Sequence, residues 1–414
     1  MKKHLICIIA IISVICFCGA HAVYAEQGSD GTEQVLTAQE VGEEYDEVID
    51  SGKCGDDLIW EARERRVVID EDGNYDIIRH ILAIKGSGAM YNYEYQDEAL
   101  PWNYFGYQEV IIEEGVTSIG SYAFLQNFSL EKAVLPSTLK KIGEGAFKGC
   151  ESLNSVNFPE GLTTIGSNAF DTDISLTQIT LPNSLTKIQE SAFSYCSNLK
   201  KVTFGNKLTT VGSHAFSSCE KLETVSLPKS VTRIGEGAFC FCYNLRKVTL
   251  RSGLKRIDAE AFNETPKLKE FRMPNTVTKI GNRILGYSGV TTVTISKKVK
   301  VIPEEAFMRC KKLKKVTMPN VTEIGFFAFE ECVKIKSITL PKTLKKIGDC
   351  AFAGCSGLTK VTVPAKTKKI GLYAFQYCKG MKVIKLPKGV KLGNGKDVFF
   401  QCSKKLKIKY YKTK

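Results

Sequence analysis

The stretch from Leu222 to Cys242 reads LETVSLPKSVTRIGEGAFCFC and contains one full unit of a repeat. Val225 and Leu227 alternate with polar residues, which predicts a short strand with one face turned inward. Pro228 ends this strand because proline has no N–H to donate to a β-ladder. The glycine after the next isoleucine permits a turn, and the Ala-Phe pair places a small residue where coils crowd beside a large one that fills the interior.

The Ala-Phe pair recurs along the chain at steps of 22 to 24 residues, and eleven of thirteen positions in this register keep both residues. A period of roughly 20–29 residues with several apolar positions is typical of a leucine-rich repeat solenoid. We therefore predict about thirteen coils, whose short strands stack in a parallel sheet because no single coil can bury its own apolar edge. The thirteen pairs are Ala123-Phe124, Ala146-Phe147, Ala169-Phe170, Ala192-Phe193, Ala215-Phe216, Ala238-Phe239, Ala261-Phe262, Ile284-Leu285, Ala306-Phe307, Ala328-Phe329, Ala351-Phe352, Ala374-Phe375 and Val398-Phe399.

The N-terminus has the pattern of a secretory signal peptide over residues 1–25. Two lysines precede an apolar run, and Val23-Tyr24-Ala25 forms a small-residue cleavage site. The run is shorter than the roughly 20 residues that a membrane span needs. We expect cleavage near Ala25, a secreted or cell-surface protein, and no transmembrane span in the mature chain.

Four further segments follow the signal peptide. Residues 26–51 are acidic without a clear period, which predicts a disordered leader. Residues 52–114 are assigned to a β-rich N-terminal cap, residues 115–402 to the repeat array, and residues 403–414 to a basic C-terminal cap or tail.

The formal charge of +14 is unevenly placed. Residues 26–114 carry 23 acidic and 6 basic side chains, whereas residues 115–414 carry 21 acidic and 50 basic ones. The chain is therefore a strong dipole with a basic body. Such a body favours anionic partners at low salt, although the same charge also serves solubility.

The recurring Leu-x-x-Val-x-Leu-Pro, Ile-Gly-x-x-Ala-Phe and following Cys resemble the BspA-type leucine-rich repeat family of bacterial and protist surface proteins. Residues 52–60, with 86–90 and the Pro101-Trp102 pair, resemble the cap region that precedes such arrays. The resemblance implies a solenoid with an N-terminal cap. It also implies a role in adhesion to host matrix proteins or to other cells.

Nine cysteines occupy one column, three residues after the phenylalanine of the repeat. The other four coils place Asn127, Asp173, Thr265 and Ser288 there, which suits a shared packing slot better than a set of metal ligands. Side chains in register point the same way, which is poor disulfide geometry. We expect buried free thiols, with disulfides in an exported protein as the alternative. The column consists of Cys150, Cys196, Cys219, Cys242, Cys310, Cys332, Cys355, Cys378 and Cys402.

The sequence offers no convergent catalytic or metal-binding set, and no cofactor is expected. His80 and His214 are isolated, and His214 is read as an exposed variable position of the repeat. A structural zinc site needs two close pairs of cysteine or histidine, which the spacing of these residues in the sequence does not supply. Cys54, Cys240 and Cys350 lie off the column and are predicted to be the more reactive thiols. The pairs Glu304-Glu305 and Glu330-Glu331 look like solvated loop charges.

Basic residues flank the exposed threonines of the predicted strands and repeat along one face. Solenoids use such faces for extended binding, and an array of lysines attracts a polyanion in a salt-dependent way. The predicted binding residues are Lys200, Lys201, Arg246, Lys247, Lys314, Lys315, Lys336 and Lys360.

The leading interpretation is an exported, non-enzymatic solenoid that binds a host or bacterial surface protein, or an anionic glycan. One alternative is an envelope-retained structural protein that holds anionic wall polymer. Another is a carbohydrate-active enzyme with paired carboxylates, which the scarcity of acidic pairs disfavours. Nucleic acid is disfavoured by the export signal and by the few aromatics among the lysines. The oligomeric state is not predicted.

Overall fold

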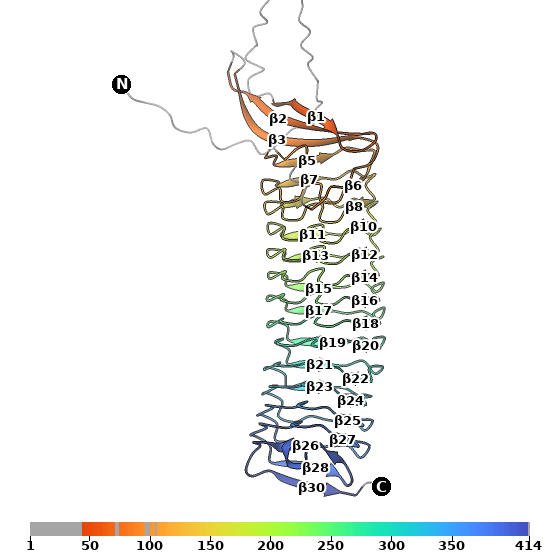
Figure 1. Cartoon of the computed structure of the whole chain (residues 1–414), viewed down its shortest axis with the longest axis vertical. Coiled ribbons are helices and arrows are strands. Elements are labelled where there is room, and N and C mark those ends of the chain that lie inside the picture. The colour runs from red at the N-terminus through yellow and green to blue at the C-terminus, as the bar shows by residue number, and fades with distance from the viewer. Residues whose placement is uncertain (1–43, 71–73, 96–99, 104–105, 413–414) are drawn as a thin grey trace, which may run out of the picture.

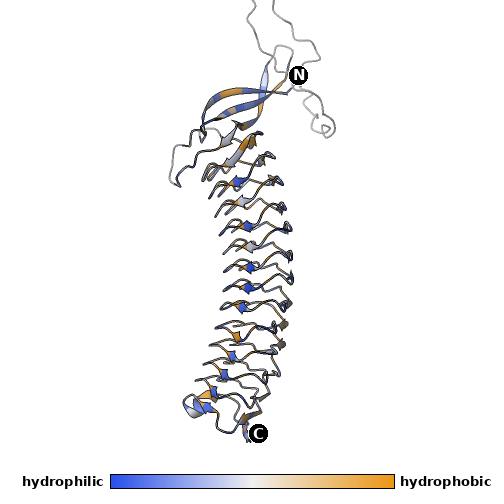
Figure 2. Cartoon of the chain, turned by 90° about the vertical axis from the view of Figure 1, so that its right-hand side faces the viewer, coloured by the Kyte–Doolittle hydropathy of each residue, from blue (hydrophilic) through white to orange (hydrophobic). Residues whose placement is uncertain are grey.

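The computed structural model describes residues 44–70, 74–95, 100–103 and 106–412. The predicted signal peptide and residues 26–43 of the predicted leader lie outside these residues. The described chain is a β-solenoid of stacked coils with an antiparallel hairpin at its N-terminal end (Figure 1). A view turned by 90° shows that the stack bends gently along its length (Figure 2). This architecture confirms the predicted leucine-rich repeat solenoid.

Most coils contribute one strand to a first parallel ladder, whose strands come from the Lys-Val-Thr part of the repeat. Pairing runs in four groups, β5 to β9, β11 to β17, β19 to β23 and β26 to β30, and within them neighbours pair without register shifts, as in Ile179↔Val202 and Val225↔Val248. The valine points inward and its two neighbours point outward, as the alternation in the sequence predicts. The strands of this ladder are β5 (Glu109–Ile112), β7 (Lys132–Val134), β9 (Ser155–Val156), β11 (Gln178–Thr180), β13 (Lys201–Thr203), β15 (Thr224–Ser226), β17 (Lys247–Thr249), β19 (Glu270–Arg272), β21 (Thr292–Thr294), β23 (Lys315–Thr317), β26 (Lys360–Thr362), β28 (Val383–Pro387) and β30 (Lys407–Tyr411).

A second parallel ladder arises where each coil passes through the residues just before the repeat's glycine. Most of its strands have two residues and end in a buried isoleucine, as β16 does with the exposed Arg233 before Ile234. The strands of this ladder are β4 (Gly88–Ala89), β6 (Val116–Ile119), β8 (Lys141–Ile142), β10 (Thr164–Ile165), β12 (Lys187–Ile188), β14 (Thr210–Val211), β16 (Arg233–Ile234), β18 (Arg256–Ile257), β20 (Lys279–Ile280), β22 (Val301–Ile302), β24 (Glu323–Ile324), β25 (Lys346–Ile347), β27 (Lys369–Ile370) and β29 (Lys391–Leu392).

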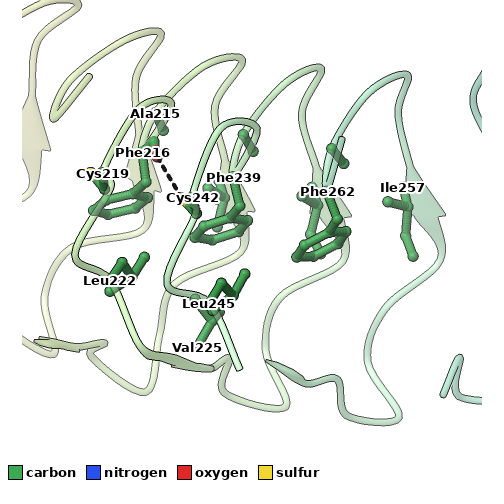
Figure 3. Close-up of a cluster of buried hydrophobic side chains, with 14 of the residues drawn as sticks. Ala215, Phe216, Cys219, Leu222, Val225, Phe239, Cys242, Leu245, Ile257 and Phe262 are labelled. Atoms are coloured by element: carbon green, nitrogen blue, oxygen red, sulfur yellow. Dashed lines mark hydrogen bonds between the residues drawn. The ribbon is translucent and has the colours of Figure 1, made fainter. Parts of the chain in front are cut away.

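The phenylalanines of successive coils stack along the axis of the solenoid. Phe193, Phe216, Phe239 and Phe262 follow one another at centroid distances of 5.4 to 5.5 Å and are nearly parallel. Figure 3 shows the last three of these rings. All four are fully buried, and burial of each ring contributes roughly 1.5–3 kcal/mol. The degenerate coil places Leu285 in this stack, where no ring continues it. The stack resumes in the coils that follow.

The repeat's glycine is required by close contact between adjacent coils. A Cβ on Gly235 would lie 2.6 Å from the carbonyl carbon of Gly212 in the preceding coil. The turn that carries Ala-Phe imposes a second constraint, because its flanking residues adopt a positive φ. His214 has φ 52° and Ser218 has φ 57°, and Gly237 and Phe241 occupy the same two positions of the next coil.

The N-terminal cap is built from a long hairpin that docks on the first coil. Strands β1 (Glu44–Lys53), β2 (Leu58–Val68) and β3 (Tyr75–Gly86) are antiparallel, and β3 then pairs in parallel with β5. Trp102 is fully buried and donates its Nε1–H to the carbonyl oxygen of Ala123 over 3.0 Å. Its ring lies 6.1 Å from that of Phe124, so the cap closes the end of the phenylalanine stack.

The structure moves two of the predicted boundaries. Residues 44–51 of the predicted disordered leader belong to β1 rather than to a leader. A register shift between Val48 and Asp50 interrupts the alternation of this strand, which hides its period in the sequence. At the other end, β30 pairs with β28 in parallel, so the ladder continues past the predicted boundary at Cys402.

The connection after β29 leads into a short 3-10 helix, η1 (Gly395–Phe399), in the last coil. Val398 of this helix is fully buried and takes the place of the repeat's alanine. Phe399 stacks on Phe375 at 6.1 Å. The coil register therefore persists to the C-terminal end although the sequence motif has changed.

Candidate functional site

The first-strand face consists of the exposed residues of strands β11 to β26 of the first ladder and the residue before each strand. Lys201 and Lys247 both pair with Thr224, one from each side. They are therefore two coils, or roughly 10 Å, apart. The face is a regular lattice on which charge placement follows from the repeat.

All eight predicted binding cations are exposed on this face. Lys201, Lys247, Lys315 and Lys360 lie in strands, and the other four directly precede a strand or the bridge between Ser337 and Lys360. The structure brings them together as two groups rather than one. The coil of β19 lies between the groups and presents Glu270 at the strand position where the first group has lysine.

The first-strand face also carries acidic residues among its cations. Glu223 and Glu270 are exposed, and Glu270 lies 3.5 Å from Arg272 in an ion pair. Exposed ion pairs of this kind contribute little to stability. The face therefore presents a mixed pattern of charge and threonine hydroxyls, which suits a partner with its own mixed surface.

A second cationic surface lies on the other ladder, and sequence reasoning missed it. We define the second-strand face by the exposed residue of each second-ladder strand and the residue before it. The sequence signal for this face is a Lys or Arg directly before the repeat's Ile-Gly. This signal lies outside the first strand of the repeat, from which the binding residues are predicted. Its basic residues, all exposed, are Lys140, Lys141, Lys187, Arg233, Lys255, Arg256, Lys279, Lys300, Lys345, Lys346, Lys368, Lys369 and Lys391.

Few carboxylates neutralise the second-strand face. Asp258, which occupies the glycine position of its coil, is buried and binds both Arg233, over 2.7 Å, and Arg256. Lys346 contacts Glu323. Within the part of the chain that the structure describes, the other ten basic residues have no ion pair. Their charge is available to an external anion.

The cysteine column lies in the interior beside the phenylalanine stack. Eight of the nine column cysteines are fully buried, and Cys402 is half-buried. Each thiol donates a hydrogen bond to a carbonyl oxygen of the preceding coil, as Cys219 does to Phe193 over 3.3 Å. Burial raises the pKa of Cys310 and of Cys355 to about 12. These thiols therefore stay protonated and act as small buried donors.

The last two column cysteines differ from the rest. The interaction between the thiols of Cys378 and Cys402 lowers the pKa of Cys402 and raises that of Cys378. Burial raises the pKa of both thiols, so it opposes the shift at Cys402 and adds to the shift at Cys378. The pair lies at the C-terminal end of the stack, where the interior begins to open.

The four polar replacements in the column also satisfy groups in the interior. Thr265 donates its hydroxyl to the carbonyl oxygen of Phe262 over 2.9 Å. Asp173 accepts a hydrogen bond from the backbone N–H of Cys150 over 2.9 Å, but its Oδ2 has no partner. Burial raises the pKa of the Asp173 carboxyl well above its usual range. The slot therefore needs a small side chain that can form hydrogen bonds, and a carboxylate is a costly choice there.

The off-column cysteines are not the reactive thiols that we predict from the sequence. Cys54, Cys240 and Cys350 are all buried. Desolvation raises the pKa of each thiol, to about 12 for Cys54. A thiol reacts as the thiolate, so burial makes these three groups inert.

His214 is half-buried rather than exposed as predicted. A Cβ on Gly237 would lie 2.4 Å from its Nδ1, so the imidazole packs over that glycine in the next coil. Three of the four paired carboxylates are half-buried and so differ from the solvated loop charges expected, whereas Glu304 is exposed. Glu305 binds Arg283, and Glu331 lies 3.4 Å from Arg309. These carboxylates hold adjacent coils together.

The described residues contain no group of three or more His, Cys, Asp or Glu side chains placed to hold a metal ion. Over the same residues, no helix has the length and apolar character needed to cross a membrane.

Comparison with known proteins identifies the repeat. The family profile of the BspA type leucine rich repeat region matches in six copies over residues 103–196, 163–291 and 286–407. The comparison with curated proteins found no match.

Solved structures of bacterial leucine-rich repeat proteins resemble the fold. A protein from Bacteroides ovatus is 26% identical over 84% of this chain and 97% of its own, with a TM-score of 0.62. One from Eubacterium ventriosum is 25% identical over 84% and 97%, with a TM-score of 0.49. A leucine rich cell surface protein from Faecalibacterium prausnitzii is 23% identical over 78% and 92%, with a TM-score of 0.44.

Proposed function

Since the chain belongs to the BspA-type leucine-rich repeat family, we propose that it is exported to the bacterial surface and binds a macromolecule there without catalysing a reaction. The observation that carries this proposal is the first-strand face. Its outward side chains recur in register over many coils, while the apolar residues of the same strands point inward. Such a lattice contacts a large partner at many points and offers no enclosed site for a small one.

The proposed partner is a host or bacterial surface protein, or an anionic glycan. The eight exposed cations supply long-range attraction, and the threonine column between them supplies hydroxyl donors and acceptors. Two charge groups separated by Glu270 favour a partner whose own surface alternates in charge. Adhesion to such a surface is the role that this arrangement supports best.

A catalytic role has little support in the geometry. A shallow dent with essentially no enclosed volume lies beside Leu227 and Leu254, and its lining is mostly apolar. It is smaller than the roughly 300–1,000 Å³ of ordinary ligand sites. One carboxylate of each acidic pair, Glu305 or Glu331, is engaged by an arginine. A carbohydrate-active enzyme therefore remains the weaker alternative.

Export and binding are tested separately. N-terminal sequencing of the full chain produced in a bacterial host should give a mature protein that begins at Glu26, and retention of Met1 in the cytoplasm would contradict export. The mature protein should then bind at least one member of an array of matrix proteins, bacterial surface proteins and anionic glycans. Absence of binding to every class would contradict the proposed role.

A further inference from the structure

The C-terminal part of the solenoid holds a concentration of charge that the first-strand face does not explain. Residues 342–412 contain 18 lysines and two aspartates, with no arginine or glutamate. All 18 lysines are exposed. We call this region, from Lys342 to Lys412, the lysine-rich end.

The lysines of this end surround the coil rather than line one strand. Lys346 and Lys369 lie on the second ladder, Lys360 and Lys385 lie on the first, and Lys366 lies in the connection between ladders. Of the 18, Lys346 alone has a carboxylate within ion-pair distance among the residues described. Like charges gathered without neutralisation repel one another, which an anionic ligand would relieve.

The densest part of this end has a regular spacing. Lys345 and Lys346, then Lys368 and Lys369, then Lys391 occupy three consecutive coils of the second-strand face. Adjacent coils lie about 4.8 Å apart along the stack. This interval is close to the length of one sugar ring in a linear polysaccharide. A polymer with one carboxylate on each sugar therefore carries its charges along the chain at about the density with which the coils carry their lysines.

We propose that the lysine-rich end binds a linear anionic polysaccharide that runs along the second-strand face over β25, β27 and β29. The proposal rests on the proposed function, because such a polymer is met outside the cell. Lysine suits this ligand better than arginine does, since an ammonium is a point charge on a flexible stem and needs no fixed fork geometry. The contact is diffuse and salt-dependent.

The charge distribution also gives the bound chain an orientation. The N-terminal segment 26–114 carries a net charge of −17. Its described part forms the cap at the opposite end of the stack (Figure 1). A polyanion attracts the lysine-rich end and repels the cap. The cap therefore projects away from the polymer. The first-strand face of the coils between the cap and the lysine-rich end does so as well.

Stacked bases are a poorer ligand for this end. The exposed ring of Tyr377 meets Phe400 edge to face, with the rings 82° apart and 5.9 Å between centroids. These rings contact each other and do not form a ladder of open platforms, which single-stranded nucleic acid uses.

The test compares two variants of the mature full-length protein that lose the same charge. One carries Lys345→Gln, Lys346→Gln, Lys368→Gln and Lys369→Gln. The control carries Lys297→Gln, Lys298→Gln, Lys311→Gln and Lys312→Gln, which are exposed lysines of the connections between the ladders and belong to neither face. Polygalacturonate is the probe, and neutral dextran and single-stranded oligothymidylate are the comparison ligands. Affinity is measured at low and high salt, with a melting curve for each protein.

At low salt the lysine-rich-end variant should bind polygalacturonate about tenfold more weakly, and the control about twofold or less, with melting unchanged in both. Equal weakening by the two variants would assign binding to the overall charge and overturn the proposal. Absent or salt-insensitive binding of polygalacturonate, or tighter binding of oligothymidylate, would overturn it as well. The proposed function would survive these outcomes, because the protein and glycan array tests it through the first-strand face.

Discussion

The thiol of Cys242 donates a hydrogen bond to the carbonyl oxygen of Phe216 in the preceding coil, over 3.3 Å (Figure 3). The same contact recurs between Cys219 and Phe193 and between Cys378 and Phe352. The cysteine column therefore links each coil to the one before it. This hydrogen bond explains why the column position, which is buried beside the phenylalanine stack, is filled in the other coils by side chains that can form hydrogen bonds.

The buried thiols should be protected from reagents in the native protein. We expect a thiol-labelling reagent to leave most column cysteines unmodified until denaturant is added, and to reach them then without any reductant. Mass mapping of the labelled peptides provides the measurement. Disulfide bridges between successive column cysteines in the native protein would contradict this prediction.

Removal of one thiol should destabilise the stack. Cys242→Ala deprives the Phe216 carbonyl oxygen of its donor and leaves a small void, at a cost of about 1–3 kcal/mol in the free energy of unfolding. Cys242→Ser keeps a donor and should cost less. Urea unfolding of both variants provides the measurement, and equal loss in the two would show that packing alone governs the column.

Asp173 should make stability depend on pH. Burial holds the pKa of its carboxyl above the unfolded value, so the folded protein keeps a proton that the unfolded chain releases. Its stabilising contribution is complete at a pH below the unfolded pKa and is lost as the pH rises toward the folded pKa. Asp173→Asn keeps an oxygen acceptor for the Cys150 N–H but does not titrate.

We therefore expect the Asp173→Asn variant to gain stability over the unmodified protein as the pH rises from about 4 to 7. Urea unfolding at several pH values gives the difference, and Asp171, which both proteins retain, cancels in the comparison. A difference that does not change with pH would show that the pKa of the Asp173 carboxyl is the same in the folded and unfolded states, which contradicts the prediction.

The purified protein should show no turnover on panels of peptidoglycan, glycans and peptides. Glu305 and Glu331 bind Arg283 and Arg309, and such pairing opposes the role of a general acid for these two carboxylates. Reproducible turnover that disappears when Glu330 and Glu331 are both changed to Gln would contradict the non-enzymatic assignment.

The sequence predicts the coils well because each coil repeats the same local constraints. Alternation around Val225, the proline that ends the strand and the glycine that permits coil contact are all local signals. Each of these signals can be recognised in the sequence of a single coil. The family resemblance adds the cap, whose tryptophan at 102 the structure places over the first phenylalanine ring.

Other features depend on contacts that the repeat does not encode. The strand at Glu44–Lys53 pairs with β2 through a bulge, so its alternation breaks in the middle. The sequence did not lead to a prediction of the second-strand face as a cationic surface, because its cations come singly or in pairs before a buried isoleucine. Burial of Cys240 depends on the Ser217 side chain of the preceding coil, 3.1 Å away, which no local pattern indicates.

We propose that the first-strand face binds the macromolecular partner. The direct measurement is the affinity of the mature protein for its best array partner, at low and high salt, before and after reversal of Lys200, Lys201, Arg246 and Lys247 to Glu. These side chains are exposed while Val202 between them and the core is buried, so melting should not change. We predict a strong, salt-sensitive loss of binding for the fourfold reversal and a small one for any single Lys→Ala change. Salt-insensitive binding that survives the fourfold reversal, with melting unchanged, would contradict the claim.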